Sequence, residues 1–119
     1  MIRVSLDDAT VATGEMLTGR VHWTAEDERG ARAIAIVAQW HTLGEGDRAY
    51  GVGRGTRVVI QRDQRNAEIP FRLLIPHEGP ITFEGELVSI VWRLWVRVDR
   101  LGLDEIAETE FRVGARRRT

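Results

Sequence analysis

The sequence predicts an all-β, immunoglobulin-like antiparallel β-sandwich of about seven strands. Apolar residues recur at every second position through most of the chain, and clusters of glycine, proline and polar residues separate these rows. No window shows a convincing helical stripe. A period of two is typical of strands that bury one face and expose the other, so two packed sheets would bury every apolar row once.

The predicted strands follow the apolar rows in chain order. They cover residues 1–6, 15–24, 32–42, 52–62, 67–75, 86–98 and 104–113. The row from Val88 to Val98 is the clearest, because apolar residues alternate there with serine, arginine and aspartate. Residues 101–109 are the best rival for a helix, but the segment is short and contains glycine. We therefore interpret it as a loop that enters the last strand.

Turn-forming segments separate these rows. They are residues 7–14, 26–30, 41–55, 61–66 and 76–85. The segment 41–55 is rich in glycine, and we expect a long hairpin loop there. Trp23, Trp40 and Trp92 fall on apolar rows and are predicted to lie in the core.

The length of 119 residues fits one domain, which we place at residues 1–113. Residues 114–119 form a basic tail with Arg116, Arg117 and Arg118, and we expect this tail to be disordered. The chain has no cysteine, which excludes disulfides and thiolate sites. All 17 basic residues are arginine, so Schiff-base and phosphate-loop lysines are excluded too.

The net charge of −1, with acids and bases interspersed, gives no drive toward nucleic acid. The longest apolar runs are too short to cross a bilayer, and no signal peptide is visible, so we expect a cytoplasmic protein without membrane insertion. No motif predicts a cofactor. Gly51–Gly55 resembles a phosphate cradle only in composition, since a strand rather than a helix follows it.

Catalytic and metal-binding patterns are weak. Ser5 and Ser89 both fall inside predicted strands, without the turn that exposes a nucleophilic serine. The three histidines are far apart in the sequence and lack metal-ligand spacing; they are His22, His41 and His77. Carboxylate pairs occur only in turns or at strand ends; they are Asp7 and Asp8, Glu26 and Glu28, and Glu84 and Glu86. No catalytic or metal site is therefore predicted.

Three segments in chain order resemble motifs of the arrestin amino-terminal fold. They are Thr-Gly-Glu-Met-Leu-Thr-Gly-Arg-Val at 13–21, Ile-Pro-Phe-Arg-Leu-Leu-Ile-Pro at 69–76, and the passage from Pro80 to Trp92. In the first motif, Gly14 suits a tight turn, and Gly19 permits close packing or a bulge within a strand. The resemblance covers residues 1 to 113 and implies a single-domain arrestin-like β-sandwich.

The resemblance also implies a scaffold or adaptor class without naming a partner. A full arrestin has two such sandwiches, whereas this chain can hold only one. The phosphate-sensing lysines of visual-type arrestins have no counterpart here, so binding of phosphorylated receptors does not carry over.

Arg93, Trp95 and Arg97 share a predicted outer face, opposite the apolar row of the same strand. Tryptophan and arginine are favoured in interface hot spots, so this strip is the candidate partner-binding site. Its alternative is stacking of arginine on tryptophan at a solvated sheet.

We expect a non-enzymatic protein-interaction module of arrestin-like fold. Its partner would dock at a sheet edge, on the outer face near Trp95, or on the loop 43–56. Self-association of the chain through one of these surfaces is a second possibility. A sandwich that binds a small ligand, carbohydrate or calcium, is the alternative, and an enzyme is the third reading.

Overall fold

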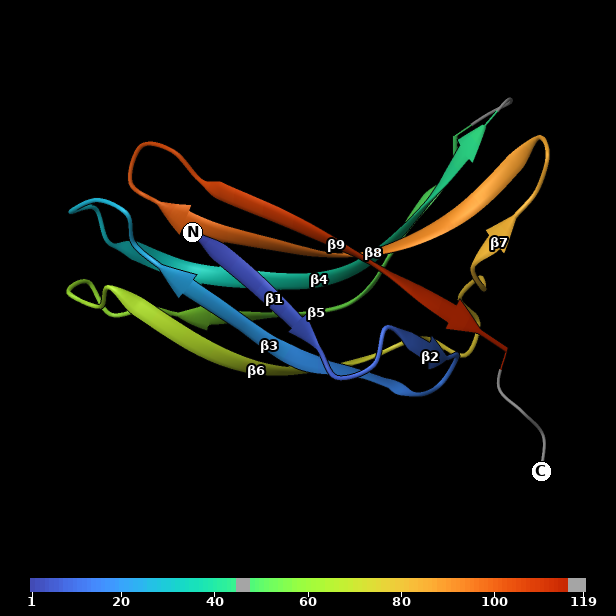
Figure 1. The fold of residues 1–119 in the computed structure, drawn as a ribbon, viewed down its shortest axis with the longest axis horizontal. Helices are drawn as coiled ribbons and strands as arrows, with labels where there is room; N and C mark the ends of the chain where they lie inside the picture. Colours follow the sequence, from blue (N-terminus) through green and yellow to red (C-terminus); the bar gives the residue numbers. More distant parts are fainter. Residues whose placement is uncertain (45–47, 116–119) are drawn as a thin grey trace.

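The computed structural model describes residues 1–44 and 48–115. Within these residues the strands form two sheets. The smaller sheet has the order β1 (Ile2–Leu6), β3 (Met16–Thr24), β6 (Asn66–Leu74). The larger sheet has the order β2 (Thr10–Ala12), β9 (Glu105–Gly114), β8 (Val88–Arg100), β4 (Ala31–Gly44), β5 (Tyr50–Val59), and β7 (Phe83–Glu84) pairs with β8. The chain is therefore a sandwich of two unequal sheets (Figure 1).

The core lies between the two sheets and is built from their inner rows. β8 contributes Trp92, Leu94, Val96 and Val98, all of which are buried. β4, beside β8 in the same sheet, adds Ile34, Ile36 and Ala38. The smaller sheet supplies the facing residues, among them Leu17, Val21, Trp23, Ile69, Phe71 and Leu73. Alternation of period two places these side chains on one face of each sheet, as the sequence predicts.

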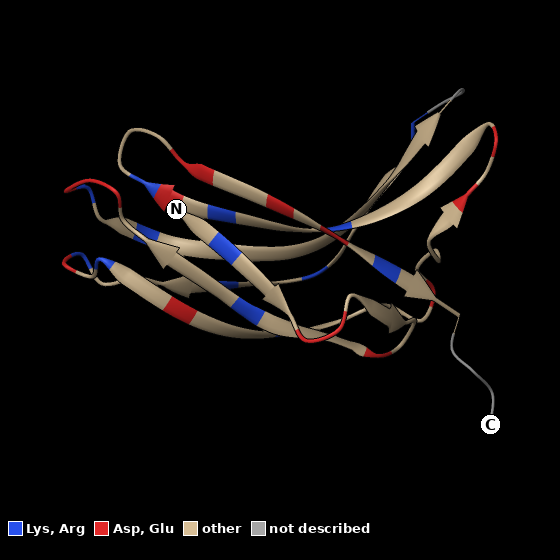
Figure 2. Ribbon diagram, in the orientation of Figure 1, with Lys and Arg blue, Asp and Glu red and all other residues tan. Residues whose placement is uncertain are grey.

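The larger sheet extends past the smaller one. At the right of Figure 1, the end of β4 and the beginning of β8 curve upward beyond the smaller sheet. Figure 2 shows that charged residues gather at the opposite end, beside the N-terminus, while β8 carries no charge along this overhang. The two ends of the sandwich therefore differ in chemistry.

The predicted sandwich is confirmed, and each of the seven predicted strands has a counterpart. The structure adds β2 and β7, which have three and two residues and are too short to show an alternation. It also adds one parallel pair, because β2 runs alongside β9 in the same direction. The final strand begins at Glu105, in agreement with the predicted loop-to-strand transition.

The predicted glycine-rich loop is wrong for most of its length. β4 continues to Gly44 and β5 already begins at Tyr50, so Gly51, Gly53 and Gly55 lie inside a strand. Gly51 pairs with Trp40, and a Cβ on it would lie 2.4 Å from the indole nitrogen of Trp40. Gly51 therefore makes room for a large neighbour rather than for a turn. Trp40 itself is half-buried and packs against the core from its margin.

The glycines of the first arrestin-like motif have the predicted roles. Gly14 has a φ of 80°, which suits a turn and strains other residues. Gly19 lies within β3, where a Cβ would come within 2.3 Å of the Ser5 carbonyl oxygen. The smaller sheet therefore requires glycine at this position.

The described residues contain no helix that is long and apolar enough to cross a membrane. The predicted basic tail falls mostly outside the described part of the chain, since Arg116, Arg117 and Arg118 lie there. The predicted domain end at residue 113 stays a prediction.

Candidate functional site

The outer face of the larger sheet carries a hollow above two alanines of β4. Strand pairing sets Ala35 between Arg57 of β5 and Arg97 of β8, and it sets Ala33 beside Asp99 of β8. Alanine side chains are too short to fill the space between these long neighbours. The hollow therefore follows from the residue sizes and from the register of three strands.

The hollow has a volume of about 330 Å³. Its lining consists of Ala33, Ala35, Arg57, Trp95, Arg97 and Asp99. Ala33 is only 1% exposed and forms the floor, whereas the half-buried Trp95 forms part of the wall. An apolar floor with a charged rim is the composition of a surface that receives one apolar side chain and orients it with polar contacts.

The charges around the hollow are unequally paired. Arg97 Nε lies 2.9 Å from Asp104 Oδ2, and Arg93 Nη1 lies 3.1 Å from Glu108 Oε2. Arg57 is exposed and makes no ion pair with any carboxylate of the described residues. The rim therefore offers Arg57 as a cation that no carboxylate of the described residues approaches within ion-pair distance.

The three residues of the predicted strip lie together on the outer face, as the alternation along β8 predicts. Arg93 and Trp95 are half-buried and Arg97 is exposed. Arg93 pairs with Glu108 of β9, and Arg97 pairs with Asp104 in the turn between β8 and β9. Their role in binding is not tested by this placement and stays a prediction.

The sequence did not single out Arg57, Ala33, Ala35 and Asp99. These residues join the strip only through the pairing of β8 with β4 and of β4 with β5. A weak signal was present, since alanine alternates with larger residues at the beginning of β4. The register that places those alanines beneath Trp95 is a tertiary property.

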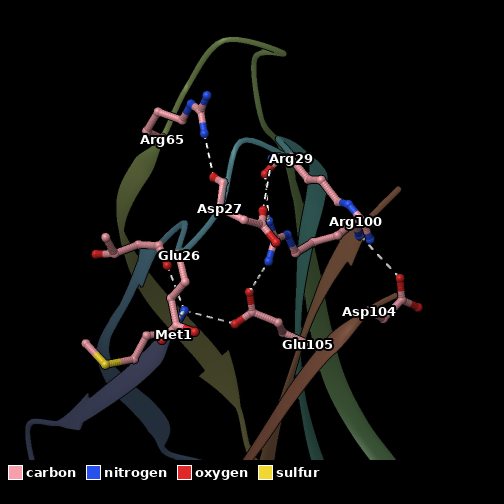
Figure 3. A network of polar contacts seen from close by, with 9 residues as sticks. Met1, Glu26, Asp27, Arg29, Arg65, Arg100, Asp104 and Glu105 are labelled. Atoms are coloured by element: carbon pink, nitrogen blue, oxygen red, sulfur yellow. Dashed lines mark hydrogen bonds and ion pairs between the residues drawn. The ribbon is translucent and has the colours of Figure 1, made fainter. Parts of the chain in front are cut away.

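A second cluster of polar residues lies at the end of the sandwich beside the N-terminus (Figure 3). Its centre is Arg100, whose side chain is 8% exposed. The guanidinium donates to Glu105 Oε1 at 2.8 Å, to the Arg29 carbonyl oxygen at 2.7 Å and to the Asp27 carboxylate. One buried arginine therefore joins the β3–β4 loop to β8 and β9.

The amino terminus and Arg65 extend this network. The Met1 ammonium lies 3.0 Å from Glu105 Oε2 and donates to the Thr24 carbonyl oxygen at 2.6 Å. Arg65 Nη1 donates to the Asp27 carbonyl oxygen at 2.5 Å. These contacts link four segments that are distant in the sequence.

The network lowers the pKa of two of its carboxyl groups. Burial opposes ionisation of Glu105, but the amino terminus, the Trp23 indole and Arg100 outweigh it and lower the pKa of this carboxyl. The Trp23 indole nitrogen is buried near this carboxyl but has no hydrogen-bond partner of good geometry among the described residues. For Asp27, the hydrogen bond from the Arg29 backbone is the main reason for a lowered pKa. Each residue labelled in Figure 3 makes at least one polar contact within the fold, which indicates a structural clamp. Arg100 Nε is nevertheless buried without a hydrogen-bond partner among the described residues.

The other candidate residues form no hydrogen-bonded group within the described residues, although the register places Ser5 diagonal to His22 and Ser89 diagonal to His41 on neighbouring strands. His22 lies on β3, His41 on β4 and His77 in the loop after β6, where its ring packs against Gly14. Ser5 and Ser89 lie inside β1 and β8. Within the described ranges, no group of three histidine, aspartate or glutamate side chains is placed to hold a metal ion.

The fold has a counterpart of known structure. The crystal structure of Spo0M, a sporulation control protein from Bacillus subtilis, matches with a TM-score of 0.77 over 97% of this chain, at 21% sequence identity. The fold is arrestin-like. The chain spans about half the length of Spo0M, since the match covers 49% of that protein. No known family profile and no curated protein matches the sequence.

The arrestin-like resemblance of the three sequence motifs is thereby confirmed at the level of the fold. At 21% identity the likeness to Spo0M describes architecture alone. The control of sporulation named for Spo0M belongs to that protein. What this chain binds must be argued from its own surface.

Proposed function

We propose that the chain is a non-enzymatic protein-interaction module, an adaptor or scaffold, which docks a partner on the outer face of the larger sheet. The observation that carries this proposal is the hollow beside Trp95, with its alanine floor and the exposed, unpaired Arg57 on its rim. An aromatic residue beside a small apolar depression is the composition of an interface hot spot.

The occupant that fits this surface is a separate protein with an apolar side chain next to a carboxylate. The apolar side chain would fill the space above Ala33 and Ala35, against the ring of Trp95. The carboxylate would pair with Arg57, which has no acidic partner among the described residues. Arg97 and Asp99 would set the orientation of the partner from the opposite rim.

The absence of catalysis is part of the proposal. It is supported by the side-chain hydrogen bonds of the described residues, none of which joins a serine or threonine hydroxyl to a histidine. The cysteine-free composition suits a reducing compartment, and we propose a cytoplasmic location on that basis.

Photocrosslinking from the hollow tests the proposal. A benzophenone side chain placed at position 97 should capture one partner from cells of the native host, and the same group at position 20, on the smaller sheet, should not. The captured protein is then purified, and its binding to wild type, Trp95→Ala and Arg57→Glu is measured by calorimetry.

The expected result is an affinity at least about tenfold weaker for each variant. Tyr50→Ala is the matched control, because this aromatic residue is 81% exposed and lies away from the hollow. Equal capture from both positions, or equal affinity of Trp95→Ala and wild type, would refute the assignment. Crosslinks only between copies of the chain would make the surface a self-association site instead.

A small-ligand module, for carbohydrate or calcium, stays the untested alternative. No contact of the described residues favours it over protein docking. A rise in the melting temperature with millimolar calcium or with a glycan would support it.

A further inference from the structure

The outer edge of the larger sheet is formed by β5, and this edge is long and unpaired. β5 has ten residues, and among the described strands it pairs only with β4. The other free edges of the described sheets are shorter or interrupted: β2 has three residues, β9 is unpaired on that side only over 105–111, β1 has five residues, and β6 carries Pro70 at its middle. Proline on an edge strand blocks further pairing, and β5 has no such block.

The backbone groups that point away from the sheet follow from one hydrogen bond. Ile60 N donates to the Arg32 carbonyl oxygen at 2.8 Å, so the amide of Ile60 faces β4. In an antiparallel pair, successive residues point their backbone groups to alternate sides. The N–H and C=O groups of Gly55, Arg57 and Val59 therefore face outward, where an additional strand would bind.

The side chains of this edge are basic. Arg54 and Arg57 are exposed, and no acidic residue occurs between Tyr50 and Ile60. Neither arginine is paired with a carboxylate of the described residues. A second copy of β5 would bring the same two positive charges to the edge, and like charges on facing strands are destabilising. Charge complementarity instead favours an acidic strand.

We infer that the β5 edge accepts an acidic, extended segment of a partner protein as an added strand. Hydrogen bonds to Gly55, Arg57 and Val59 would supply affinity, and carboxylates facing Arg54 and Arg57 would supply specificity. This edge is distinct from the Trp95 hollow, although Arg57 borders both. The inference would stand if the hollow bound nothing.

Three labelled ten-residue peptides test this inference against the intact chain. The first alternates glutamate and valine, and the second alternates lysine and valine. The third has the glutamate–valine sequence with N-methyl groups on its two central amides, which point to opposite edges of an extended chain and so block pairing on both. Binding is measured by fluorescence anisotropy at low ionic strength, and amide hydrogen exchange of the protein is followed by NMR.

The glutamate–valine peptide should bind at least about tenfold more tightly than either other peptide, since charge-assisted contacts and strand hydrogen bonds both contribute. It should slow the exchange of Gly55, Arg57 and Val59 amides, which exchange fast in the free protein. Arg57→Glu should weaken binding about tenfold, whereas Trp95→Ala should leave it unchanged. This last variant separates failure of the edge from failure of the hollow.

Three results would overturn the inference. Equal affinity of the N-methylated peptide would mean charge attraction without strand pairing. Equal or tighter binding of the lysine–valine peptide would remove the role of the arginines. Protection of the same three amides in the free protein, increasing with protein concentration, would assign the edge to a second copy of the chain.

Discussion

The two faces of β8 place Trp92 and Trp95 in opposite environments. Trp92 is fully buried, its indole N–H donates to the Pro80 carbonyl oxygen at 2.8 Å, and its ring centre lies 5.8 Å from that of Phe111. Trp95 faces outward and remains half-buried above a hollow that no described residue fills. A buried tryptophan with a bonded N–H is satisfied within the chain, whereas an outward one beside a depression leaves aromatic surface that a partner can cover.

This contrast teaches that one strand can carry stability on one row and recognition on the other. Substitutions on the inner row should lower the free energy of unfolding. Substitutions on the outer row should change binding and leave the fold intact. The expected losses of stability run from several kcal/mol on the inner row to less than about 1 kcal/mol on the outer row.

Trp92→Ala should lower the free energy of unfolding by about 3–5 kcal/mol, because it removes a fully buried aromatic side chain and leaves a cavity. Urea denaturation followed by circular dichroism measures this loss. Trp92→Phe serves as the milder variant if the alanine protein does not fold. A loss below about 1 kcal/mol for the alanine variant would show that Trp92 is not a core residue.

Arg100→Gln should lower the free energy of unfolding by about 2 kcal/mol at neutral pH, because it removes charged hydrogen bonds from Asp27 and Glu105. Arg20→Gln is the matched control: its ion pair with Glu68 is exposed on both sides, so its loss should cost less than about 1 kcal/mol. Equal losses for the two variants would contradict the clamp at the end of the sandwich beside the N-terminus.

The stability difference between wild type and Arg100→Gln should shrink on acidification. The pKa of Glu105 is lowered in the folded protein from its ordinary value of 4.5, and that of Asp27 is lowered from 3.8. A carboxyl group whose pKa is lower in the folded than in the unfolded state stabilises the fold when the pH is above its unfolded-state pKa. This contribution is lost as the pH falls through its folded-state pKa. Denaturation curves at neutral pH and near pH 3 measure the change, and a constant difference would argue against ionised partners for Arg100.

The strands and the core were predictable because each depends on a local pattern. In the row from Val88 to Val98, Trp92, Leu94, Val96 and Val98 are buried, whereas Val88 and Ile90 at its beginning are half-buried. The positions of Gly14 and Gly19 were also predictable, since a turn and a close approach of two strands both require a residue without a side chain.

The predicted loop over residues 41–55 was wrong because a glycine there is required by a residue distant in the sequence. Gly51 lies in a strand because the Trp40 ring occupies the space of its side chain, and that neighbour is visible only in the pairing of β4 with β5. The hollow escaped prediction for the same reason. Trp95 was identified from its own strand, whereas Arg57 and the two alanines reach it through register across three strands.

The smallest stability effect belongs to Trp95→Ala, which should change the free energy of unfolding by less than about 1 kcal/mol. Urea denaturation measures this value beside that of Trp92→Ala. A loss comparable to that of the inner tryptophan would mean that both faces of β8 are structural.

The affinity of folded Trp95→Ala for the crosslinked partner tests the central claim most directly. It is measured by calorimetry with wild type and Tyr50→Ala in parallel. The account predicts binding at least about tenfold weaker than wild type with an unchanged fold and an unchanged control. Wild-type affinity in the Trp95→Ala variant would contradict it.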